Sequence, residues 1–189
     1  MELRPTTSGR ILFAGDIWCH AQSGLSGILE ARLRLDHPGA PWRFWHRGEP
    51  SVSARQLLDE AALRLFGRDA HRVLVSIGHA PHDQSASPEV LSDLRRLLDL
   101  LSDKLPEQAW ILLPSPSLWP ESQREAALRI RETLEQGHPS VRRIDAEPQV
   151  QAFLAAQDEE HGASLCQPGP APTHLGAVLL SRIVHAAWS

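Results

Sequence analysis

Short apolar runs typical of buried strands alternate along this chain with longer stretches of helical periodicity. Such alternation predicts right-handed βαβ crossovers and a parallel sheet that helices cover on both faces. We therefore expect an α/β fold: a three-layer αβα sandwich, flavodoxin-like, with a mostly parallel sheet of about five strands. The expected strands are 11–14, 42–46, 72–77, 110–113 and 141–144. The expected helices are 26–35, a segment from Ser51 or Ser53 to Gly67, 87–105, 122–136 and 175–187.

Length and charge limit the kind of protein that can form. With 189 residues, 42% of them hydrophobic, the chain fits one globular domain that covers 1–189. A net charge of −4 argues against nucleic acid as a partner. No segment reaches the ~20 apolar residues of a membrane span, and the N-terminal residues lack the apolar stretch of a secretory signal. Two cysteines, Cys19 and Cys166, suggest no disulfide framework, so we expect a cytoplasmic protein.

The ends of the expected strands are where a binding site belongs, because open α/β sheets bind ligands at the carboxyl ends of their strands. Polar or glycine residues stand at each of these ends. They are Gly15-Asp16, Gly48, Gly78-His79 and Pro114-Ser115.

Four segments in this order resemble the sequence blocks of the SGNH, or GDSL, hydrolase family, and the likeness covers nearly the whole chain. FAGDIW is similar to the first block, in which Gly-Asp precedes the catalytic serine. HRGEPSVSARQLL is similar to the second, whose glycine would be Gly48. VLVSIGHAPHD is similar to the third block, Gly-x-Asn-Asp, and QPGPAPTHLGAVLLSRIV to the last, Asp-Gly-x-His-Pro before a glycine and a helix.

The resemblance implies an acyl-transfer site from which the reacting groups are missing. Family chemistry needs a serine, a histidine, an aspartate and an asparagine in the oxyanion hole. The serine position holds Ile17 and the asparagine position holds Ala80. The last block aligns in two registers: the aspartate position is Pro168 or Ala171, and the histidine position is Ala171 or His174.

We therefore expect no catalytic residue, no cofactor and no metal, and lean against an enzyme. The leading hypothesis is a pseudo-hydrolase that binds a partner protein or a small ligand through its former active-site cleft. In that cleft Trp18 and Trp119 would fill space or stack on a flat ligand. The expected cleft residues are Asp16, Ile17, Trp18, Gly48, Gly78, His79, His82, Trp119 and His174.

Three alternatives stay open at this stage. The chain could be an ester or acyl hydrolase with relocated residues; Cys19 is one candidate, although a small buried thiol fits its spacing better. Asp16 and His20 could share a helix face, and a metal could bind the loop histidines. The weak metal candidates are His20, His79, His82 and His174. The domain could also be a rigid component of a larger assembly.

Overall fold

Five parallel strands form a single sheet in the order β2-β1-β3-β4-β5. The computed structural model describes residues 9–22, 24–50, 52–66, 68–78, 85–157, 165–166 and 173–188. The strands are β1 (Arg10–Gly15), β2 (Arg43–Gly48), β3 (Arg72–Ser76), β4 (Ala109–Leu112) and β5 (Arg142–Ile144). Each strand is joined to the next strand along the chain through a helical crossover, as the alternation of the sequence predicts. The expected three-layer α/β architecture is confirmed.

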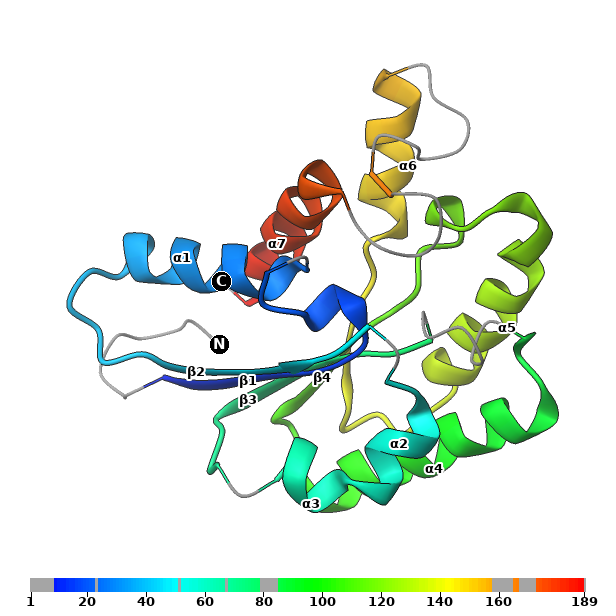
Figure 1. Ribbon diagram of the computed structural model, residues 1–189, viewed down its shortest axis with the longest axis horizontal. Helices are drawn as coiled ribbons and strands as arrows, with labels where there is room; N and C mark the ends of the chain where they lie inside the picture. Colours follow the sequence, from blue (N-terminus) through cyan, green and yellow to red (C-terminus); the bar gives the residue numbers. More distant parts are fainter. Residues whose placement is uncertain are drawn as a thin grey trace.

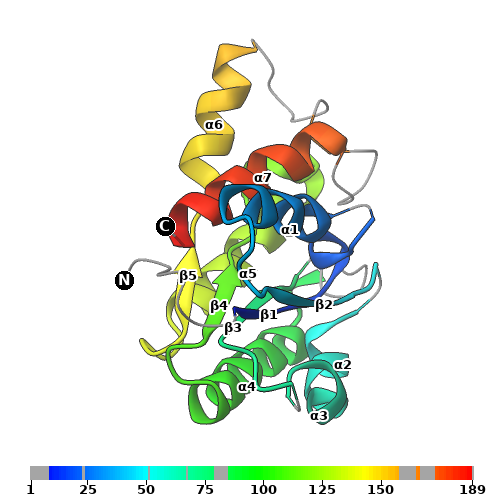
Figure 2. The same cartoon turned by 90° about the vertical axis from the view of Figure 1, so that its left-hand side faces the viewer.

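Helices cover both faces of the sheet (Figures 1 and 2). On one face lie α1 (Leu25–Asp36) and α7 (His174–Trp188), which contact each other. The opposite face carries α2 (Ala54–Asp59), α3 (Ala61–Arg64), α4 (Pro88–Lys104) and α5 (Arg124–Glu135), with α4 in contact with both α2 and α5. The remaining helix, α6 (Glu147–Ala156), stands above the sheet on the side of α7. Among the described helices, none is long and apolar enough to cross a bilayer.

The helices differ from the expected ones in two places. The segment expected to run to Gly67 divides at Glu60, whose backbone N–H ends α2 by donating to Gln56 and Leu58 carbonyls. Helix α6 was not expected at all. Only two of its side chains, Val150 and Leu154, are buried, and they are four residues apart. This apolar pattern is too sparse to predict a helix from the sequence.

A cluster of aromatic rings and one cation lies between the sheet and the end of α7. Phe13 of β1 stacks on Trp188 of α7, with ring centroids 6.3 Å apart, and on His46 of β2, at 5.1 Å. The Arg72 guanidinium lies over both Trp188 and Trp110, 5.4 and 5.7 Å from the ring centroids. Cation–π contacts of this kind let a partly buried arginine support packing without a carboxylate.

A polar chain links β2 to α1 beside this aromatic layer. The His46 Nε2 atom lies 2.7 Å from Glu30 Oε2, and its Nδ1 lies 3.0 Å from Ser26 Oγ. Ser26 in turn donates to the Cys19 carbonyl. Burial alone would raise the pKa of the Glu30 carboxyl, but hydrogen bonds from His46 and Arg34 outweigh burial and hold that pKa below its ordinary value. The chain therefore stabilises the fold while Glu30 is ionised.

We expect Glu30→Gln to lower the free energy of unfolding at pH 7 by about 0.5–1 kcal/mol, because the pair is partly screened by solvent. A depressed carboxyl pKa contributes stability above its unfolded value of about 4.3 and loses it as the pH falls further. Urea denaturation at pH 7 and at pH 3 measures both points, and the difference from wild type should shrink at pH 3. Glu132→Gln, at an exposed position of α5, is the control. A Glu30→Gln effect no larger than the control at pH 7 would contradict this role.

Candidate functional site

The carboxyl ends of β1 and β3 meet at a very close backbone contact. Gly15 has φ +111°, and a Cβ at this position would lie 1.8 Å from the Ser76 carbonyl oxygen. Only glycine fits there, because it tolerates positive φ and has no side chain. The next N–H, that of Asp16, donates to the same carbonyl at 2.9 Å. This contact fixes where the chain leaves the sheet.

The Asp16 carboxylate is fully buried directly after β1. Its Oδ1 accepts a hydrogen bond from Ser76 Oγ at 2.7 Å and one from the Trp18 backbone N–H at 3.2 Å. The second bond caps the short 3₁₀ helix η1 (Ile17–Cys19). Asp16 therefore acts in the structure as a link between β1, β3 and η1.

The side chains of η1 offer no nucleophile at this edge. Ile17, which the sequence resemblance places at the serine position, is half-buried and packs on the core. Cys19 is fully buried, and its Sγ lies 3.8 Å from the Leu74 carbonyl oxygen. Burial, and then the charge of Asp16, raise the pKa of the Cys19 thiol far above its ordinary value. The thiol stays protonated at physiological pH, which is the state of an inert buried cysteine.

Gly48, the glycine of the second block, is needed for the close packing of η1 against β2. A Cβ here would lie 2.2 Å from the Cys19 carbonyl carbon and 2.6 Å from the His20 nitrogen. Gly78, after β3, has φ +105° and faces Ile130 of α5. These two glycines at the carboxyl edge allow backbone and side chains to approach closely.

The large and basic side chains of this edge differ in exposure. Trp18 and Trp119 are 1% and 3% exposed, so both rings lie in the interior and fill space there. His174 is exposed at the first position of α7. The expectation that Asp16 and His20 share a helix face is wrong, because η1 has only three residues; Asp16 is its N-cap and His20 its C-cap, so α-helical spacing does not apply.

Several expected site residues lie outside the described part of the chain: His79, Ala80, His82, Pro168 and Ala171. The loss of the oxyanion asparagine and of the triad aspartate therefore stays a prediction. Within the ranges that the structure describes, no group of three or more histidine, cysteine or acidic side chains is arranged to hold a metal ion.

A serine–carboxylate pair that the sequence did not predict lies beyond the ends of β4 and β5. Ser117, in the 3₁₀ helix η3 (Pro116–Leu118), donates from Oγ to Glu147 Oε1 at 2.5 Å. Glu147 opens α6, and Gln151 Nε2 donates to the same oxygen at 2.8 Å. Asp145 accepts the Glu147 N–H at 2.9 Å and pairs through both oxygens with Arg131. The Arg131 hydrogen bonds hold the pKa of the Asp145 carboxyl below its ordinary value.

Solved structures resemble this fold over nearly its full length. A protein from Parabacteroides merdae assigned as a GDSL-like lipase superposes with a TM-score of 0.74 at 15% identity, over 100% of this chain and 99% of its own. The acetylxylan esterase from Geobacillus stearothermophilus superposes with a TM-score of 0.74 at 15% identity, over 98% of this chain and 97% of its own. The lipase/acylhydrolase from Enterococcus faecalis has a TM-score of 0.71 and 12% identity, over 95% of this chain and 94% of its own.

The chain has the SGNH/GDSL hydrolase fold. The fold class expected from the four blocks is thus confirmed. Because the sequence identities are 12–15%, the comparison shows the shared fold and no shared activity. No protein-family model matches the sequence, and a search of curated proteins finds no relative. In the Geobacillus stearothermophilus esterase, alanine in place of one serine or of one histidine gives a catalytic mutant.

We expect Asp16→Ala to lower the free energy of unfolding by about 1–3 kcal/mol, because it leaves the buried Ser76 hydroxyl and the Trp18 N–H without this acceptor. Ser76→Ala should cost less, about 1 kcal/mol, because Asp16 keeps its bond to Trp18. Urea denaturation of both single variants and of the double variant gives the coupling between the two side chains. Additive effects, or an Asp16→Ala protein as stable as wild type, would contradict the linking role.

Proposed function

We propose that this chain is a catalytically degenerate protein with the SGNH/GDSL hydrolase fold, which binds a partner protein or a small ligand at the carboxyl edge of its sheet. The observation that supports this most is the sequence Gly15-Asp16-Ile17 at the end of β1. An aliphatic side chain stands where the resemblance places the attacking hydroxyl. Because Ile17 can neither form a covalent intermediate nor release a proton, the family mechanism has no first step.

The surroundings of Ile17 also favour a non-catalytic role. The preceding residue, Asp16, is a buried carboxylate that accepts hydrogen bonds from Ser76 and the Trp18 backbone. Cys19, two residues further on, is buried and has a raised pKa. Serine hydrolases that lose their nucleophile retain only the modest catalysis of the oxyanion hole and of substrate binding. We therefore infer that this edge binds without turnover.

The Ser117–Glu147 pair supports a second candidate, an ester or acyl hydrolase with a relocated nucleophile. Its 2.5 Å hydrogen bond places a carboxylate on a half-buried hydroxyl at the same end of the sheet. A carboxylate alone is a weak general base for a serine hydroxyl, a task that hydrolases commonly give to a histidine. The same bond also joins η3 to α6, which is sufficient reason for the pair to exist. We rank this candidate second.

Hydrolysis of p-nitrophenyl acetate separates the two candidates. We expect purified wild-type protein and Ser117→Ala to release nitrophenol at the same rate, close to that of an unrelated protein at equal concentration. Turnover about a hundredfold faster than that background, lost in Ser117→Ala, would overturn the leading proposal in favour of the relocated serine. Equally fast turnover retained in Ser117→Ala would overturn both and require a nucleophile elsewhere.

A further inference from the structure

A pocket of about 480 Å³ opens at the opposite edge of the sheet from Asp16. It lies where β1, β3 and β4 begin, and Arg10, His71 and Gln108 line it from these starts. The remaining walls come from the segment after α3 and from the end of α4. Nothing in the resemblance to hydrolases uses this edge, because the family blocks all map to the carboxyl ends of the strands.

The charged side chains of this amino-edge pocket are mostly cations. Arg10, Arg68 and Lys104 line it together with a single carboxylate, Asp69. Lys104 also pairs with Asp103 outside the lining, at 2.7 Å. With Asp103 counted, a positive surplus remains, in a chain whose net charge is −4. A local excess of cations on an acidic protein concentrates anions at that place.

The geometry around Arg10 leaves donors available. Its Nη2 donates to His71 Nε2 at 3.0 Å; a guanidinium has no acceptor, so that ring nitrogen must be the acceptor. Its Nη1 is 3.7 Å from Asp69, too far for a hydrogen bond. Its Nε is shielded from solvent, so a ligand in the pocket would meet the Nη atoms. Arg68 lies against the Trp45 ring, 6.0 Å from its centroid, and no carboxylate of the described residues pairs with it.

The pocket also has an apolar floor. Leu65, Ala70 and Leu105 are buried there, and Phe66 is half-buried beside them. A ligand that suits these walls has an anionic group for the cations and a small apolar body for the floor. Guanidinium and ammonium groups offer only donors, and a phosphate group offers three acceptor oxygens and about two negative charges.

We propose that the amino-edge pocket formed by Arg10, Arg68, His71 and Lys104 binds a phosphate monoester with a small apolar group. The phosphate lies between the Arg10 and Lys104 side chains, and the apolar group contacts Leu65 and Leu105. This site is independent of the carboxyl edge, so it stands whether or not the chain hydrolyses esters.

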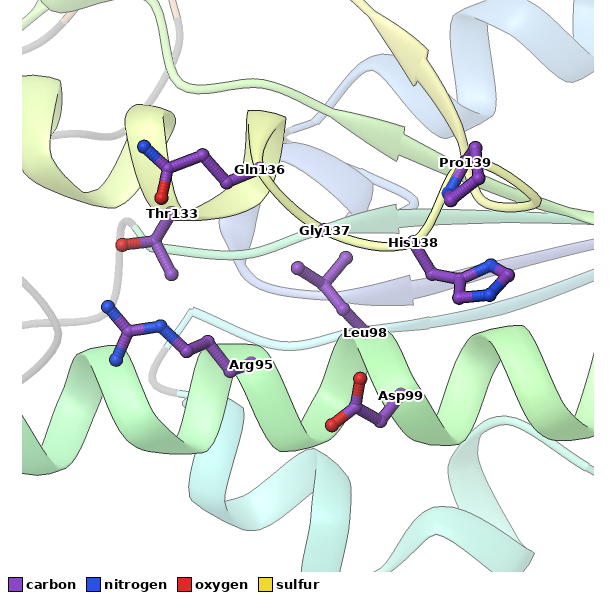
Figure 3. A pocket seen from close by; sticks show the side chains of 8 residues that line it. All are labelled: Arg95, Leu98, Asp99, Thr133, Gln136, Gly137, His138 and Pro139. Atoms are coloured by element: carbon purple, nitrogen blue, oxygen red, sulfur yellow. The ribbon is translucent and has the colours of Figure 1, made fainter.

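The other described pocket, of about 440 Å³ between α4 and the loop after α5, provides the control (Figure 3). There the cation Arg95 shares the lining with the carboxylate Asp99, one helical turn away, so the charges balance. Figure 3 shows both side chains rising from α4 beneath Thr133, Gln136 and His138. This balanced lining does not select an anion, and Arg95→Ala removes one arginine without affecting the amino-edge pocket.

Isothermal titration calorimetry with phenyl phosphate tests the proposal on the full chain. We expect saturable binding, at least about tenfold weaker in Arg10→Ala and in Lys104→Gln and within about twofold of wild type in Arg95→Ala. Lys104 is exposed, so its variant tests the site without risk to folding. Inorganic phosphate should bind several-fold more weakly, because it lacks the apolar group. Binding of phenyl phosphate should also weaken as salt rises from about 50 to 300 mM.

Other results would overturn the proposal. One such result is that wild type does not bind phenyl phosphate. Another is that Arg95→Ala loses as much affinity as Arg10→Ala. A third is that Arg10→Ala or Lys104→Gln keeps the affinity of wild type. Benzoate that binds as tightly as phenyl phosphate would replace the phosphate with a carboxylate and overturn the assignment of the ligand.

Discussion

The buried contact between Asp16 and Ser76 determines the geometry of the whole carboxyl edge. It joins the ends of the neighbouring strands β1 and β3, at a point where Gly15 lets the backbones approach too closely for any side chain. The same carboxylate starts η1 by capping the Trp18 N–H, so the direction of the chain after β1 depends on it. A carboxylate used in this way is held in the interior and links β1, β3 and η1.

The two edges of the sheet differ in chemistry. At the carboxyl edge, Ile17 packs on the core, and Trp18 and Trp119 fill the interior. At the amino edge, four of the five strands, β1, β2, β3 and β5, begin with an arginine. Two of these, Arg72 and Arg142, lie over the Trp110 ring and serve packing. Arg10 instead lines a pocket with the segment after α3 and the end of α4, which leaves cations at that edge for a ligand.

Most of the fold follows from the sequence because the three inner strands, β1, β3 and β4, are short apolar runs between helical patterns. Strands of a parallel sheet that is covered on both faces are near-continuous apolar runs, so this pattern indicates the fold class. Helix α6 could not be predicted because only Val150 and Leu154 bury their side chains. The site was harder, because its pairs join residues far apart in the chain: Ser117 with Glu147, and Arg10 with His71. Only the fold brings such partners together, and the identity of one residue does not reveal the other.

The resemblance of the sequence blocks and the structural likeness lead to the same fold. Whether this fold hydrolyses esters depends on whether any serine in it is activated. Fluorophosphonates label serine hydroxyls that an active site has activated, and the mass of the intact protein reports the adduct. We expect the mass of the native protein to stay unchanged after prolonged incubation with an excess of such a probe. One stoichiometric adduct on a serine, located by peptide mass spectrometry, would contradict the proposal that this hydrolase fold has lost its nucleophile.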